Sequence, residues 1–186
     1  YEVTIECSAR KNLPDFEIVG LPDAAIRESE KRIFTGSENS GFPIPQAEIS
    51  INLAPADKKK EGTAIELAVL CAIYKSCGMI DFDSADSAFI GEISFSGDVR
   101  PVRGALGMTL AAIEAGRRNI FVPEANLAEA SVAWREGVNV YGVRDIRSLV
   151  LHLTGEELLS SASGNPYLSI TDRMSSEDFS QVKGQY

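Results

Sequence analysis

The sequence predicts an α+β or α/β protein with a mixed β-sheet covered by helices, and three observations support that class. Several short segments alternate apolar and polar residues, as half-buried strands do. Apolar segments of helical length lie between them, and helix and strand alternate regularly in the second half of the chain. One stretch with a Ser-Gly-Asp turn predicts a β-hairpin, so the sheet is expected to contain antiparallel pairs as well.

Three strands and two helices are predicted in the first half of the chain. The segments YEVTIECSA, DFEIVG and AEISINLA alternate in the manner of half-buried strands. A helix is predicted between the second and the third, because Pro22 and Asp23 suit a first helical turn while Gly41 and Pro43 end the helix. A second, buried helix is predicted over 63–77, where apolar residues are dense.

The second half begins with the predicted hairpin, SAFIGEISFSGDVRPV. The elements predicted after it are helices at 104–116, 124–136 and 145–153 and strands at 119–123 and 138–143. Beyond Gly155 the sequence is rich in Ser and Gly and has little apolar periodicity. We therefore expect residues 1–155 to form one domain and residues 156–186 to form a partly disordered linker.

The composition is typical of a soluble globular protein. Of the 186 residues, 44% are hydrophobic and 24% are charged, which is sufficient for one domain with a substantial core. No apolar run approaches the roughly 18 residues needed to span a bilayer. The chain opens on Tyr1, already in a strand-like pattern, so we expect it to be a fragment of a longer protein.

Charge and metal-ligand content narrow the function classes. A net charge of −9 argues against broad nucleic-acid binding, although it leaves a local basic face open. His152 is the only histidine, which excludes a site built on two or more imidazoles. Cys7, Cys71 and Cys77 match no common metal spacing, and reduced thiols are favoured over a disulfide. We expect no metal site and no cofactor in this chain.

The stretch NLAPADKKKEGTAIELAV allows two interpretations. Thr63 and Glu66 have the T-x-x-E spacing of a capping box, in which each side chain binds a backbone N–H at the start of a helix. The same helix start, with Gly62 and three lysines beside it, could instead bind an anion. We favour the cap, because no G-x-x-x-x-G-K-[ST] motif is present. The three lysines are Lys58, Lys59 and Lys60.

Four arginines fall in two pairs. Arg117 and Arg118 follow a predicted helix, where positive charge complements the helix dipole. Arg100 and Arg103 follow the hairpin and have no structural explanation in the sequence. We therefore treat Arg100 and Arg103, with the lysine loop, as candidate contacts for an anion, DNA or a protein interface.

Three long segments resemble one protein family. LPDFEIVGLPDAAIRESEKRI, NSGFPIPQAEISINLAPADKKKEG and GEISFSGDVRPVRGALGMTLAA closely resemble the amino-terminal domain of the ComM/YifB family of magnesium-chelatase-like AAA+ ATPases. The resemblance runs in order over 1–155, and DFSQVKGQ looks like the start of the ATPase module of that family. The chain has no Walker A motif, so the resemblance implies that ATP and Mg²⁺ bind in a module that this sequence lacks.

The resemblance also implies a fold similar to the proteolytic domain of Lon and to the ribosomal-protein-like (GHMP-type) βαβ fold. KEGTAIELAV is similar to the Lon segment around the catalytic serine, and GEISFSGDVRPVRGALGMTLAA to the segment around the catalytic lysine. By this correspondence Ala64 stands at the serine position and Met108 at the lysine position. Neither side chain can act as nucleophile or base, so the resemblance implies that no catalytic residues remain.

What the resemblance implies about function is a non-catalytic regulatory or interaction domain. The parent protein is expected to be a cytoplasmic ATPase that forms a hexameric ring and remodels DNA by branch migration during natural transformation. Expected partners are the parent's own AAA+ module, further copies of the chain and DNA, with no membrane contact. Two alternatives remain open: a Lon-like serine peptidase with a rearranged site at Thr63, and a metal-chelatase subunit.

Overall fold

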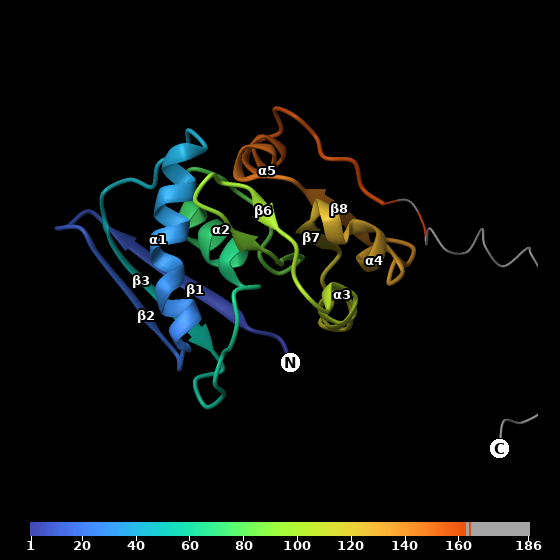
Figure 1. Ribbon diagram of the computed structural model, residues 1–186, viewed down its shortest axis with the longest axis horizontal. Helices are drawn as coiled ribbons and strands as arrows, with labels where there is room; N and C mark the ends of the chain where they lie inside the picture. The colour runs from blue at the N-terminus through green and yellow to red at the C-terminus, as the bar shows by residue number, and fades with distance from the viewer. Residues whose placement is uncertain (163, 165–186) are drawn as a thin grey trace, which may run out of the picture.

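The computed structural model describes residues 1–162 and 164 and confirms the mixed α+β class, with the strands divided over several small sheets (Figure 1). Strands β1 (Thr4–Arg10), β2 (Asp15–Val19) and β3 (Glu48–Ala54) form one sheet in the order β1-β3-β2. The central strand β3 runs antiparallel to β1 and parallel to β2. All three alternating segments of the first half are thus confirmed as strands.

Helices α1 (Ala24–Asn39) and α2 (Glu66–Ser76) cover one face of this sheet. Asp23 caps α1 by accepting a hydrogen bond from the Ile26 N–H at 2.8 Å, as its place in the sequence predicts. Alternate residues of β3 are buried with apolar side chains of both helices in one cluster. Because the side chains of a strand point to opposite faces in turn, the other face of the sheet stays polar and exposed.

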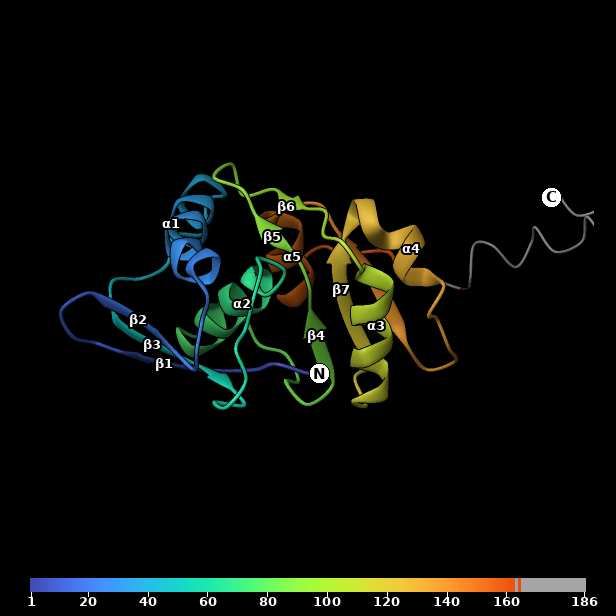
Figure 2. The same cartoon turned by 60° about the horizontal axis from the view of Figure 1, so that its bottom comes forward.

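A second sheet holds three parallel strands, β4 (Ser87–Phe89), β7 (Asn119–Pro123) and β8 (Asn139–Val143), in the order β4-β7-β8. Phe121 stacks between Phe89 and Tyr141 across this sheet, with ring centroids 4.8 and 4.9 Å away. Helices α3 and α4 lie beside it, and α2 and α5 lie toward the first sheet (Figure 2). Their bounds are α3 (Ala105–Glu114), α4 (Leu127–Ser131) and α5 (Ile146–Leu153).

The predicted hairpin is confirmed but is narrower than expected. Only β5 (Glu92–Ile93) and β6 (Val99–Arg100) pair antiparallel around the Ser-Gly-Asp turn. The preceding segment, Ser87–Phe89, forms the edge of the parallel sheet instead. The predicted hairpin segment is therefore divided: its first part pairs with β7 in the parallel sheet, and the rest forms the β5–β6 hairpin.

The predicted helix at 124–136 is wrong in extent. A 3₁₀ turn, η1 (Glu124–Asn126), precedes the short helix α4, which ends at Ser131. The Asn126 side-chain oxygen accepts from the Val102 N–H, and the Asn126 side-chain nitrogen donates to the Val102 carbonyl. These two hydrogen bonds to another segment hold the chain in the 3₁₀ turn. After Ser131 the backbone continues in i→i+3 turns, so the helical hydrogen-bond ladder does not extend.

The segment expected to be a linker begins with residues that pack on the second sheet. The Ala162 N–H donates to the Val140 carbonyl at 2.8 Å, and the Leu159 N–H donates to Nδ1 of His152 at 3.1 Å. The rest of the expected linker, residues 163 and 165–186, lies outside the described residues. Within the described part of the chain, no helix is long and apolar enough to cross a membrane.

Candidate functional site

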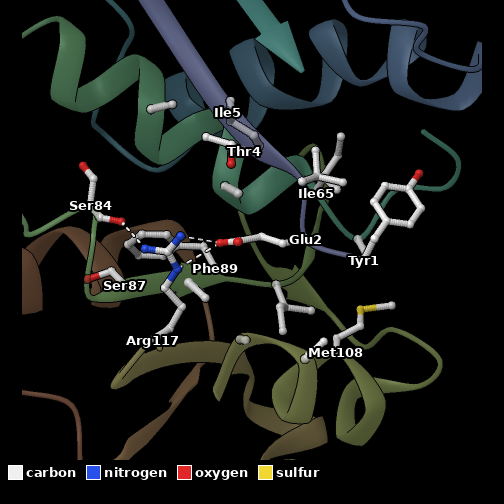
Figure 3. Close-up of a pocket in the computed structure, with 18 of the residues that line it drawn as sticks. Tyr1, Glu2, Thr4, Ile5, Ile65, Ser84, Ser87, Phe89, Met108 and Arg117 are labelled. Carbon is white, nitrogen blue, oxygen red and sulfur yellow. Dashed lines mark hydrogen bonds and ion pairs between the residues drawn. The ribbon is translucent and has the colours of Figure 1, made fainter. Parts of the chain in front are cut away.

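A groove of about 850 Å³ lies between the two sheets (Figure 3). One wall is formed by the extended segment that leads into β1 and by α2, and the opposite wall by β4 and α3. Most of the side chains along it are apolar, among them Ile5, Ile65, Phe89 and Met108. The volume lies within the range of about 300 to 1,000 Å³ that is usual for ligand pockets.

The two positions that the resemblance to Lon assigns to the catalytic dyad, Ala64 and Met108, both line this groove, on opposite walls. Ala64 lies just before α2, where its carbonyl accepts a hydrogen bond from the Gly91 N–H at 2.8 Å. Met108 lies in the first turn of α3 and is about one-third exposed, at 36%. The fold therefore brings together the two positions that the sequence comparison pairs, and the side chains there offer neither a nucleophile nor a base.

The other polar groups of the groove do not form a nucleophile–base pair. The Ser76 hydroxyl accepts from the Ala9 N–H and donates to the Cys7 carbonyl, so it is engaged with the backbone. The Lys75 ammonium lies 3.1 Å from an Asp81 carboxylate oxygen and also binds the Phe82 carbonyl. The Tyr1 hydroxyl donates to the backbone carbonyl of Lys59 at 2.7 Å. Among the described residues, no hydroxyl or thiol of the groove is hydrogen-bonded to the side chain of a lysine, a histidine or an acidic residue.

Arg117 closes one end of the groove, which corrects the expectation that it complements a helix dipole. Helix α3 ends at Glu114, and the Arg117 guanidinium points away from it toward the amino-terminal segment. Nε and Nη2 donate to one Glu2 carboxylate oxygen at 2.9 and 2.5 Å, and Nη1 donates to the carbonyls of Ser84 and Ala85. The planar guanidinium thus joins three chain segments, because it presents several donors at fixed angles.

The predicted capping box at the start of α2 is wrong. The helix begins at Glu66 after Ile65, which makes no side-chain cap. The Thr63 hydroxyl donates to a carboxylate oxygen of Glu92 in β5 at 2.5 Å instead of accepting from a helix N–H. Glu66 does not reach back, because it is fully buried and its carboxylate is held by Arg32 and by the Ile93 N–H.

The Arg32–Glu66 ion pair is the main electrostatic feature beneath this helix start. Arg32 of α1 donates from Nε and Nη2 to one Glu66 oxygen at 3.0 and 2.6 Å. Burial raises the pKa of the Glu66 carboxyl, and the hydrogen bonds from Arg32 and Ile93 counteract part of that rise. The Arg32 pKa is raised chiefly by its hydrogen bond to Glu66. A buried carboxylate needs such a partner, since an unpaired buried charge is costly.

The three lysines of the loop do not form one free basic patch, which corrects that part of the expectation. The Lys58 ammonium lies 4.8 Å from the centre of the Tyr1 ring. Lys59 pairs with Glu61 at 2.8 Å. Lys60 is buried, and its ammonium binds the Pro55 carbonyl. Only the first two ammonium groups are open to a ligand in solvent.

The anion-site interpretation of Gly62 fails for a similar reason. Gly62 has a positive φ of 84°, a conformation that suits glycine, and its N–H donates to Asp23 Oδ2 at 2.9 Å. Burial opposes ionisation of Asp23, but the N–H groups of Ile26 and Gly62 and the charge of Lys59 lower its pKa overall. A carboxylate therefore already occupies the place where an anion would bind.

Arg100 and Arg103 are both exposed. Among the described residues, neither arginine forms an ion pair with a carboxylate of the lysine loop. Arg100 lies 3.7 Å from a Glu92 oxygen, and this same carboxylate accepts from Thr63. Glu92 thus links Arg100 to the start of α2. Arg103 has no carboxylate within ion-pair distance in the described part of the chain.

In the part of the chain that the structure describes, the cysteines and carboxylates do not gather into a metal site. All three cysteines are free, as predicted, and burial is the main cause that raises the pKa of each thiol. Within residues 1–162, no group of three or more His, Cys, Asp or Glu side chains could hold a metal ion.

Sequence analysis missed the Arg32–Glu66 pair, the Arg117–Glu2 pair and the groove itself. A signal for the first was present: Glu66 opens an otherwise apolar helix, and Arg32 lies directly before the buried Ile33 of α1. No local signal pairs Arg117 with Glu2, because they are 115 residues apart.

Comparison with known proteins identifies relatives for most of the chain. The family model of subunit ChlI of Mg-chelatase matches residues 5–126. An uncharacterised protein of Mycobacterium tuberculosis is 34% identical over 98% of this chain and 36% of its own length. The competence protein ComM of Haemophilus influenzae is 31% identical over 87% of this chain and 31% of its length. The uncharacterised protein YifB of Escherichia coli is 30% identical over 98% of this chain and 35% of its length.

A weaker similarity extends to Lon proteases. The archaeal Lon protease of Methanothermobacter thermautotrophicus is 28% identical over 115 residues, which cover 61% of this chain and 18% of that protein. This match supports the resemblance of the fold to that of the Lon family. The chain spans about a third of the length of the curated relatives ComM and YifB.

Proposed function

The chain belongs to the family of the Mg-chelatase subunit ChlI and is homologous to YifB and ComM, and we propose that it is a non-catalytic regulatory or interaction domain of an AAA+ ATPase. One observation carries the proposal. At the two positions where Lon proteases have their catalytic pair, Ala64 and Met108 face one shared groove, and neither can act as nucleophile or base. A groove without a nucleophile or base at these two positions supports a binding role rather than peptide hydrolysis.

The role of the parent protein is a further part of the proposal. The relatives are about three times as long as this chain, and one of them is a competence protein. We infer that the parent binds ATP and Mg²⁺ in a separate module, assembles as a hexamer in the cytoplasm and remodels DNA. Its own ATPase module and neighbouring copies would then be the first partners of this domain.

A peptidase assay tests the absence of catalysis. We expect the purified chain to give no turnover of casein or of a fluorogenic peptide. The variant Ala64→Ser/Met108→Lys restores the pair, and any turnover by it, with none by either single variant, would support a Lon-like arrangement of the two walls. Turnover by the unchanged chain that is lost in Thr63→Ala would refute the proposal in favour of a rearranged peptidase.

Contact with DNA rests on fewer residues than the sequence indicates. Lys60 is buried, so an exposed basic contact would consist of Lys58, Lys59, Arg100 and Arg103. Replacement of these four by alanine is expected to weaken salt-dependent binding to a fluorescent DNA duplex, since each phosphate contact releases counterions. An unchanged affinity and salt dependence would remove DNA contact from the role of this domain.

A further inference from the structure

We propose that the groove between β1 and β4 binds an extended polypeptide segment, which adds to the free edge of β4 and places an acidic side chain on Arg117. The proposal deepens the interaction role proposed above by naming the chemical class of the partner. It rests on three features of the groove: an unpaired strand edge, apolar walls and one guanidinium at its end.

The unpaired edge belongs to β4, which is the outer strand of its sheet. The Asp86 carbonyl accepts from the Asn119 N–H and the Ile90 N–H donates to the Phe121 carbonyl, so the backbone of even-numbered residues faces β7. Backbone groups alternate sides along a strand, and the odd-numbered residues therefore face the other way. On that side Gly91 pairs with Ala64 and Leu67. The N–H and C=O groups of Ser87 and Phe89 have no partner there among the described residues.

This edge opens into the groove. Ser87 and Phe89 both line it, together with α3 on the same wall. An extended peptide beside β4 would continue the pairing that Gly91 begins with Ala64, and it would supply the donors and acceptors that an edge strand lacks. A small rigid ligand would leave these backbone groups unpaired, which favours a polypeptide as the occupant.

The walls suit alternate apolar side chains. Ile5 and Ile65 lie on one side and Phe89 and Met108 on the other, and the intervening volume of about 850 Å³ is large enough for several side chains. The side chains of an extended peptide point alternately to the two faces of the sheet that it extends. Every second side chain of a peptide beside β4 would therefore contact these walls. Strand addition combined with pockets for alternate side chains is a common mode of peptide recognition.

The positive charge of Arg117 favours a peptide that carries an acidic side chain. Arg117 lies at the end of the groove and already binds one carboxylate, that of Glu2, at 2.5 Å. Glu2 belongs to the extended segment before β1, and its side chain is 41% exposed, so a carboxylate from another chain could replace it at the same guanidinium. The pair shows that the groove accepts an acidic side chain carried by an extended backbone.

Fluorescence anisotropy tests the proposal with the 186-residue chain. The probe is a fluorescein-labelled peptide that alternates valine with threonine and carries one central glutamate. The blocking variant is Gly107→Trp: Gly107 lines the groove from α3, and an added Cβ meets no atom within 4 Å. Because glycine is unfavourable within a helix, this replacement should not unfold α3. The matched control is Glu114→Trp, at an exposed position of the same helix outside the groove.

We expect Gly107→Trp to weaken probe binding at least about tenfold, and Glu114→Trp to leave it unchanged. A probe with prolines in place of threonines should not bind, because proline cannot donate to a strand edge. Glu2→Gln, which frees Arg117, should tighten binding of the glutamate probe up to about fivefold and leave a glutamine probe unaffected.

Three results would overturn the proposal: no binding of the probe, equal binding by the proline peptide, or equal binding by Gly107→Trp. Binding of a single-stranded oligonucleotide that Gly107→Trp abolishes, with no peptide binding, would assign the groove to nucleic acid instead. If Gly107→Trp fails to fold, the Glu2→Gln result still decides. Failure here leaves the non-catalytic role intact, whereas peptidase turnover would refute that role and leave groove binding in place.

Discussion

The starts of α2 and α5 have similar sequence signals but bind different partners. At α5 the Asp145 carboxylate accepts from the Ser148 N–H at 2.7 Å, and the Asp145 N–H donates to the Ser148 hydroxyl at 3.3 Å, which completes a capping box. At α2 the residues Thr63 and Glu66 have the spacing of the same motif, yet both side chains bind groups elsewhere in the fold.

Burial explains the difference between the two helix starts. Ser148 is half-buried and neutral, so its hydroxyl can stay with the nearby backbone. Glu66 is fully buried and charged, and a buried carboxylate must find an opposite charge and further donors. Arg32 and the Ile93 N–H supply them. A local motif therefore forms only where no stronger tertiary demand acts on its side chains.

Removal of Arg32 should produce the largest effect. Arg32→Ala leaves the Glu66 carboxylate buried without its counter-charge, and we expect a loss of about 3–5 kcal/mol in the free energy of unfolding. Urea denaturation followed by circular dichroism measures it. The matched control is Arg27→Ala, an exposed arginine of the same helix, which should change stability by no more than about 0.5 kcal/mol.

The pH dependence of Arg32→Ala identifies the cause. Burial raises the folded-state pKa of Glu66 above its ordinary value of 4.5, and loss of Arg32 raises it further. Between the unfolded-state pKa of Glu66 and its raised folded-state pKa, the folded protein binds a proton that the unfolded chain does not bind. Stability therefore falls as pH rises through this range. The deficit of the variant should therefore shrink as pH is lowered toward 4.5. A deficit that does not vary with pH would point to lost packing rather than to the charge.

Removal of the cap at α5 should have a smaller effect. Asp145→Ala is expected to cost about 1 kcal/mol, the typical value for a lost N-cap, whereas Asp145→Asn should retain most of the stability. The neighbouring Arg144→Ala is the control, because Arg144 is an exposed partner of the same carboxylate and should contribute much less to stability than the cap does. Equal losses for Asp145→Ala and Arg144→Ala would assign the effect to the ion pair.

The pH dependence at Asp145 should have the opposite sign to that at Glu66. Burial opposes its ionisation, but the Ser148 N–H and hydroxyl and the Arg144 guanidinium lower its pKa below the ordinary 3.8. Above 3.8 the ionised carboxylate contributes its full stabilisation, and this contribution is lost as pH falls through the lowered folded-state pKa. The difference between the unchanged chain and Asp145→Ala should thus be constant near neutral pH and decline only in acid.

Much of the fold could be predicted from the sequence, because its elements depend on local patterns. Alternation gave β1, β2 and β3, and the Pro-Asp start gave α1. The division of 87–102 between two sheets could not be predicted, since strand pairing depends on partners far along the chain. The shortening of α4 depends likewise on the contact of Asn126 with Val102.

The candidate site was predictable only through the resemblance to Lon. That resemblance singled out Ala64 and Met108, which the fold brings to one groove. The prediction of a basic or anion-binding lysine loop was wrong, because sequence alone does not show that Lys60 is buried or that the Asp23 carboxylate accepts the hydrogen bond from the Gly62 N–H. Charged residues near a loop predict a basic surface only when their side chains have no closer partner.

The smallest effect, and the most direct test of the comparison, concerns the partner of Thr63. A double-mutant cycle with Thr63→Val and Glu92→Ala should give a coupling energy of about 0.5 kcal/mol, because both side chains are partly exposed and water replaces part of the lost hydrogen bond. The cycle of Thr63→Val with Glu66→Gln should give a coupling near zero. The reverse pattern would restore the capping box at α2, and burial would then no longer distinguish the two helix starts.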